Sequence, residues 1–155
     1  MTGQQAAASQ STHKVQSGQA GLRQASLAIV IVLIVQYALG IGVNLYVTLP
    51  DAGDPGHASF FGNGLLLGTH AGLGMFLILA ALFVLVRAVM ARNVTLIATS
   101  AAGLAAILLA AFFGSGFADK LTSGYSLGMA LATAAALACY AIGLYVMTAR
   151  RAKSS

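Results

Sequence analysis

The sequence predicts an all-α membrane protein, a transmembrane antiparallel four-helix bundle with up-down-up-down topology. Of its 155 residues, 59% are hydrophobic and only 7% are charged, whereas a soluble domain carries about 25% charged residues. Four apolar stretches are each long enough to cross roughly 30 Å of hydrocarbon as a helix. The basic residues gather at the ends of these stretches. Lipid is therefore expected to cover most of the surface.

The predicted transmembrane domain covers residues 25–149. Its four spans are expected at about 25–49, 64–90, 94–118 and 125–147. The last two connections are only a few residues long, which makes the helices they join antiparallel neighbours.

Two tails flank this domain. Residues 1–24 are rich in Gln, Ser, Ala and Gly. Such a segment buries too little apolar surface to offset the entropy of ordering, so a mobile cytoplasmic tail is expected. Residues 150–155 form a short basic tail, also expected in the cytoplasm.

The distribution of charge predicts the orientation of the chain. Seven of the eight basic residues fall on one side of the predicted bundle: Lys14, Arg23, Arg87, Arg92, Arg150, Arg151 and Lys153. All three aspartates and Lys120 fall on the other side. The positive-inside rule then places both termini in the cytoplasm of a bacterium, with the spans in its plasma membrane.

Composition argues against several classes of function, and the chain is predicted not to be an enzyme. There is no Glu, and Asp occurs only in loops, so no carboxylate pair is available for acid–base chemistry. The single Cys139 cannot form an internal disulfide or a cysteine metal site. No phosphate loop, zinc spacing or dinucleotide fingerprint is present. The basic residues form no stripe, so nucleic acid is not an expected partner.

Three polar residues within the spans, Gln36, Asn44 and His70, predict a binding pocket. Gln36, Gly40 and Asn44 are spaced by four and share one helix face. Counting residues from the outer ends places His70 at about the depth of Gly40. A polar group in hydrocarbon needs a partner, so Gln36 or Asn44 is expected to hydrogen-bond His70. Gly40 would leave room for the ring or for a ligand. This pocket should lie near the outer leaflet.

Three roles for His70 remain open at this stage. It could be a neutral histidine that specifies helix packing. It could be an axial ligand to haem b, with Met129 at similar depth, or His70 of a second copy, as the other ligand. It could handle protons or substrate in a small transporter or channel subunit. The leading hypothesis is a membrane subunit that binds a small ligand, haem or a partner helix. The expected partners are the lipid bilayer and either a second copy or another membrane protein.

Three glycines on the second span predict a helix contact. Gly64, Gly68 and Gly72 are spaced by four, and small residues at this spacing let helix backbones approach closely. The contact could involve another span or a second copy of the chain.

Two segments carry a resemblance to known membrane proteins. "VQYALGIGVNLYVTLP" (35–50), followed by "THAGLG" (69–74), resembles small four-span integral membrane proteins of the actinobacterial type, whose function is unassigned. The architecture also resembles one half of haem A synthase and other four-helix haem proteins. This second resemblance implies haem binding with His70 as the axial histidine of the second span. The fourth span has no histidine.

Overall fold

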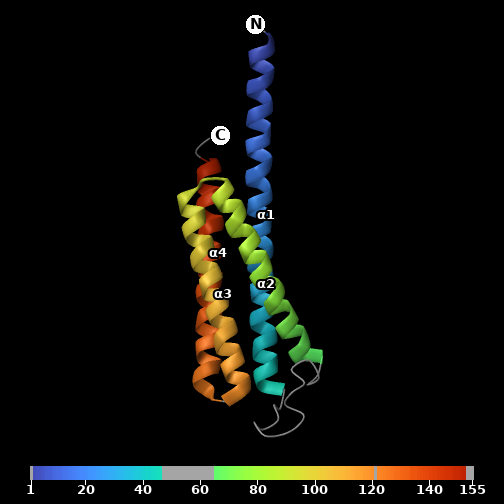
Figure 1. Ribbon diagram of the computed structural model, residues 1–155, viewed down its shortest axis with the longest axis vertical. Coiled ribbons are helices and arrows are strands. Elements are labelled where there is room, and N and C mark those ends of the chain that lie inside the picture. The colour runs from blue at the N-terminus through green and yellow to red at the C-terminus, as the bar shows by residue number, and fades with distance from the viewer. Residues whose placement is uncertain (1, 47–64, 121, 153–155) are drawn as a thin grey trace.

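The computed structural model describes residues 2–46, 65–120 and 122–152 (Figure 1). These residues form four helices: α1 (Thr2–Tyr46), α2 (Leu65–Met90), α3 (Val94–Lys120) and α4 (Ser123–Ala152). No strand occurs within the described ranges. The predicted all-α class is confirmed.

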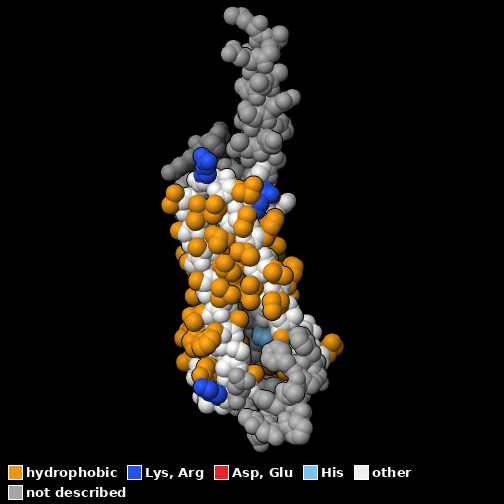
Figure 2. Space-filling model, in the orientation of Figure 1, with side chains coloured by type: hydrophobic (Ala, Val, Ile, Leu, Met, Phe, Trp, Pro, Cys, Tyr) orange, Lys and Arg blue, Asp and Glu red, His pale blue; other side chains and the backbone are white. Residues whose placement is uncertain are grey.

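Each helix contains a stretch that is long and apolar enough to cross a membrane: Ala20–Tyr46, Leu65–Met90, Val94–Ala118 and Ser123–Ala149. The third matches its predicted span, and the others differ from theirs by a few residues. Predicted positions 47–49 and 64 lie outside the described residues. Large exposed hydrophobic side chains occur on all four helices and cover the face seen in Figure 2. Such a surface suits lipid, so the chain is a multi-pass membrane protein.

Helix α1 begins far upstream of its membrane stretch. The segment predicted as a tail, residues 1–24, is helical from Thr2 onward and projects beyond the other helices (Figure 1). Its Ala and Gln residues have high intrinsic helix propensity, which an argument from burial alone does not consider. The mobility of this segment stays a prediction.

The helices pack as a four-helix bundle in which each helix touches two neighbours. The contacting pairs are α1–α2, α2–α3, α3–α4 and α1–α4. Among the described residues, no Cα atoms of the diagonal pairs, α1–α3 and α2–α4, lie within 8 Å of each other. The N-terminal end of α1 and the C-terminal end of α4 lie toward the same end of the molecule (Figure 1).

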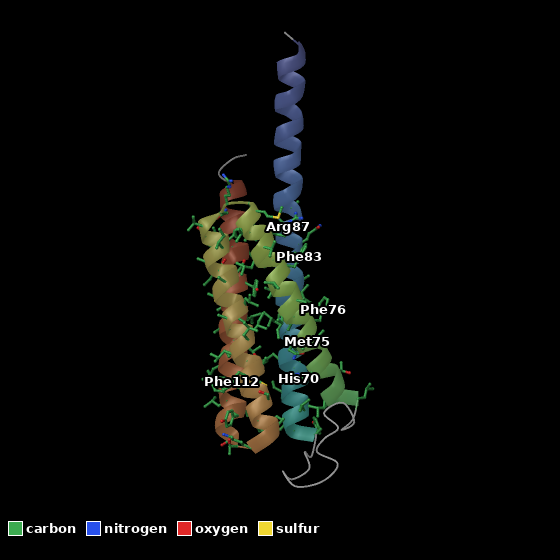
Figure 3. All side chains as sticks on the ribbon, viewed as in Figure 1. His70, Met75, Phe76, Phe83, Arg87 and Phe112 are labelled. Atoms are coloured by element: carbon green, nitrogen blue, oxygen red, sulfur yellow. The ribbon has the colours of Figure 1, made fainter. Side chains whose placement is uncertain are left out.

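Basic side chains sit at both ends of the bundle. The Arg87 guanidinium lies 5.9 Å from the Phe83 ring centroid, near one end of α2 (Figure 3). At the other end, Lys120 Nζ donates to Tyr125 Oη at 3.1 Å and lies 5.4 Å from that ring. Cations held beside aromatic rings are typical of membrane–water interfaces. The two ends of the bundle therefore match the two surfaces of a bilayer.

The core occupies the half of the bundle away from the α3–α4 connection. Leu77, Ala81, Val84, Ala136 and Tyr140 are each at most 2% exposed. The ring of Tyr140 is seated on Gly103, where an added Cβ would lie 2.6 Å from a ring carbon. Glycines allow the same close approach of Phe113 to Gly128 and of Tyr125 to Gly116. Helices α3 and α4 are consequently the most closely packed pair.

A tight turn joins α2 to α3. The Ala91 and Arg92 amides donate to the Arg87 and Val89 carbonyls at 3.0 and 2.9 Å, and Arg92 has φ 51°. A residue in this left-handed conformation closes a helix. The Asn93 side chain then accepts a hydrogen bond from the Leu96 amide at 3.3 Å and caps α3. Three residues thus complete the connection.

The predicted glycine contact is not made at Gly72 within the described part of this chain. Gly72 is exposed, and a Cβ there would meet no atom within 4 Å. Gly64 lies outside the described residues. Contact between this face and another copy of the chain stays a prediction.

Candidate functional site

A cavity of about 370 Å³ lies among the four helices, in the half of the bundle next to the α3–α4 connection. Small-molecule sites commonly have volumes of about 300–1,000 Å³. Its lining comes from residues 33–44 of α1, 67–78 of α2, 107–118 of α3 and 126–133 of α4. No Asp, Glu, Lys or Arg is among the residues described on its wall. The cavity therefore suits a neutral, mainly apolar molecule.

The cavity is closed toward the middle of the bundle and open at its sides. Leu33, Leu77 and Ile107 line it and also belong to the buried core, so they close its inner end. Tyr37 and Met75 line it too, yet they are 46% and 62% exposed. His70 also lines it and is only half-buried. Among the described residues, the wall is thus incomplete toward the exposed faces of α1 and α2.

Gln36 and His70 meet in a reciprocal arrangement across α1 and α2. An added Cβ at Gly40 would lie 3.2 Å from His70 Cε1, so the His70 ring lies against Gly40. Likewise, an added Cβ at Gly74 would lie 3.1 Å from Gln36 Nε2. The His70 ring of α2 therefore fills the space beside Gly40, which lies four residues after Gln36 on α1. The Gln36 amide fills the space beside Gly74, which lies four residues after His70 on α2. The contact of His70 with Gly40 is as predicted.

Gly74 is a site residue that the depth argument missed. Depth along the helices singled out the polar residues and Gly40, which lies between Gln36 and Asn44. The overlooked signal is the equal spacing of Gln36–Gly40 and His70–Gly74. On antiparallel neighbours, two such pairs place each polar residue opposite a glycine.

The hydrogen bonds define the orientation of the Gln36 amide. Gln36 Nε2 donates to the His70 backbone carbonyl at 2.9 Å, and a carbonyl oxygen can only accept, so the NH₂ group must face α2. The same nitrogen lies 3.5 Å from His70 Nε2, the long end of hydrogen-bonding distance. If the second Gln36 N–H donates there, Nε2 accepts and the ring proton resides on Nδ1.

Two polar atoms of this pair are buried without a hydrogen-bond partner among the described residues. They are Gln36 Oε1 and His70 Nδ1. Leaving a buried donor or acceptor unpaired costs roughly 1–3 kcal/mol. Both side chains line the cavity, so the two unpaired atoms belong to its wall. With the ring proton on Nδ1, the pair leaves one acceptor and one donor for a further hydrogen-bonding partner.

The two other predicted site residues also line the cavity. Asn44 is exposed on α1 and makes no hydrogen bond to any residue that the structure describes. It is therefore not a partner of His70. Met129 lies on α4 with its sulfur against Gly114, where an added Cβ would be 3.2 Å away. These contacts assign Met129 to packing between α3 and α4.

The residues do not fit an axial haem site. The Nε2 atom of His70 faces the Gln36 amide, its Cε1 edge is pressed against Gly40, and Nδ1 is buried. In this arrangement residues of α1 occupy the Nε2–Cε1 edge of the ring, so this edge is not available to a planar porphyrin. The described lining also holds no basic side chain to pair with haem propionates. Within the described residues, no three His, Cys, Asp or Glu side chains form a group able to hold a metal ion.

The comparisons with known proteins return no relative. No family model, no curated protein and no solved structure matches this chain. The resemblance to small four-span membrane proteins and to one half of haem A synthase stays a prediction.

Proposed function

We propose that this chain is a membrane-embedded binding protein that holds a small, mainly apolar ligand in the cavity between its helices. Gln36 and His70 hydrogen-bond to the polar group of the ligand. Gly40 and Gly74 leave space for these two side chains, and Asn44 lines the cavity. The helices run up-down-up-down through a bacterial plasma membrane with both termini in the cytoplasm, which positions the cavity in the outer half of the bilayer.

One observation carries this proposal. Gln36 Oε1 and His70 Nδ1 are buried beside a cavity of about 370 Å³ and have no partner in the described part of the chain. A histidine used only for packing would be expected to have both ring nitrogens satisfied, because unpaired polar atoms are costly in lipid. A ligand that supplies the missing partners stabilises the site.

Transport through the bundle is the second hypothesis for His70. Leu33, Leu77 and Ile107 close the inner end of the cavity and pack into the core. A conduction path would have to open this closely packed half of the bundle. The closed inner end therefore favours binding over transport.

A fluorescent reporter tests the proposal. 1-Aminoanthracene, whose emission increases in apolar cavities, is titrated into the protein in lipid nanodiscs. Saturable binding is expected. A110F, which fills the cavity wall on α3, should weaken it at least about tenfold, because overpacking excludes the probe. A138F adds the same ring to an exposed position of α4 outside the lining and should leave binding unchanged. Equal binding by all three proteins would overturn the proposal.

A further inference from the structure

We infer that the ligand is a neutral lipid-soluble alcohol, whose hydroxyl group hydrogen-bonds to both Gln36 Oε1 and His70 Nδ1–H. This inference rests on the proposed function and names the chemical class of the ligand. It follows from the hydrogen-bonding capacity of the two side chains, from the absence of charge on the described wall, and from the openings of the cavity at its sides.

The first step concerns the two unpaired atoms. Gln36 Oε1 can only accept a hydrogen bond, because the amide NH₂ is directed at the His70 carbonyl. His70 Nδ1 carries the ring proton when Nε2 accepts from Gln36. The amide and the ring are in contact through Gln36 Nε2 and His70 Nε2, so the acceptor and the donor belong to two side chains that touch. A hydroxyl group is complementary to such a pair, since its O–H donates while its oxygen accepts.

Other polar groups of a ligand do not pair with both Gln36 Oε1 and His70 Nδ1–H. An ether or ketone oxygen accepts but has no proton, so it would leave Gln36 Oε1 unpaired. A hydrocarbon would leave both atoms unpaired. A carboxylate or ammonium group would bring a charge into a wall that, in its described part, has no opposite charge to pair with it. An alcohol alone among these satisfies both atoms without a charge.

The third step concerns the route of entry. Met75 on α2 and Ala111 on α3 both line the cavity and are both exposed. The adjacent Phe76 and Phe112, labelled with Met75 in Figure 3, are 56% and 65% exposed. This opening therefore faces the hydrocarbon of the bilayer, and a ligand that enters here arrives from the lipid phase. The apolar wall then holds its tail.

Displacement of 1-aminoanthracene in nanodiscs tests the inference with three probes of similar length: 1-decanol, 1-methoxydecane and undecane. They are compared at equal mole fraction in the bilayer, so that partitioning into lipid does not contribute. In the natural protein, 1-decanol should displace the reporter at least about tenfold more effectively than 1-methoxydecane, because one more buried polar atom is paired. 1-Methoxydecane should in turn exceed undecane.

The variant H70L removes the donor and keeps the bond from Gln36 to the backbone carbonyl of residue 70. In this variant the ether should lose its advantage over undecane, while the alcohol stays ahead of both through Gln36 Oε1. T69V is the matched control. The Thr69 hydroxyl donates to the Leu65 carbonyl of its own helix at 2.6 Å and lies outside the lining, so all three preferences should persist.

The outcomes separate this inference from the proposed function. Equal displacement by the three probes, or displacement by the ether as effective as by the alcohol, would overturn the inference and leave cavity binding intact. Absence of reporter binding in a folded protein would overturn both. An ether that keeps its advantage over undecane in H70L would show that the donor is not His70 and overturn the inference.

Discussion

At the scale of single residues, Gln36 and His70 are held by the glycines they face. Gly40 accommodates the imidazole ring and Gly74 lets the Gln36 amide reach a helix carbonyl. Depth counting predicted the meeting of Gln36, Gly40 and His70, because helices rise by a constant amount per residue. It did not predict that Asn44 would be unpaired within the described residues, because it measures depth along a helix and does not say toward which neighbour a side chain turns.

Alanine at Gly74 should weaken the site, whereas alanine at Gly72 should not. The Cβ of G74A would lie 3.1 Å from Gln36 Nε2, so the amide must shift by a few tenths of an ångström and its hydrogen bond to the His70 carbonyl is weakened. Weakening of this hydrogen bond should lower stability by up to about 1 kcal/mol and weaken reporter binding. G72A adds its methyl group to open space on the same helix. Melting curves in detergent and reporter titrations measure both effects; equal behaviour of the two variants would contradict the reciprocal arrangement.

At the scale of helices, α3 and α4 pack closely against each other and both line the cavity. Aromatic rings of Phe113, Tyr125 and Tyr140 are seated on glycines of the facing helix. The sequence predicted the four helices from their length and hydropathy, but it did not predict these contacts. They depend on the register between α3 and α4, which composition does not specify. The long N-terminal part of α1 was missed for a different reason, since its apolar surface is small but its helix propensity is high.

Alanine substitutions at two glycines of α4 test this wall. In G128A the added Cβ would lie 2.9 Å from the Phe113 ring, so the ring or the helix must shift. The expected loss of stability is about 1–3 kcal/mol, the usual cost of overpacking. Gly124, one turn earlier, has no atom within 4 Å of an added Cβ, so G124A should melt like the natural protein. A G128A protein with an unchanged melting temperature would show that α3 and α4 are not closely packed at this point.

At the scale of the whole molecule, one half of the bundle is a closely packed core and the other half contains the cavity. The packed half contains the buried leucines and alanines and Tyr140. The number of spans was predictable because hydrocarbon thickness sets their length. The cavity was predictable only as a cluster of polar residues, because its volume depends on how far the helices diverge.

The orientation of the molecule can be measured by cysteine labelling after Cys139→Ala. Ser123→Cys introduces an exposed thiol at the start of α4, and Ala91→Cys introduces one at the α2–α3 turn. From the positive-inside rule, an impermeant maleimide should label Ser123→Cys in intact cells, and Ala91→Cys only after permeabilisation. The reverse pattern would place both termini and the α2–α3 turn outside.

The central claim is that Gln36 and His70 hydrogen-bond to a ligand in the cavity. The ¹⁵N spectrum of the His70 ring in bilayers tests this claim most directly. His13 and His57 are replaced by Asn, so that one histidine remains. The spectrum is recorded with and without 1-decanol. The proposed pairing requires Gln36 to donate to Nε2, and we therefore predict a neutral ring protonated at Nδ1, whose Nδ1 resonance moves when the alcohol oxygen accepts its proton. A ring protonated at Nε2, or an Nδ1 resonance unchanged at saturating 1-decanol, would contradict the account.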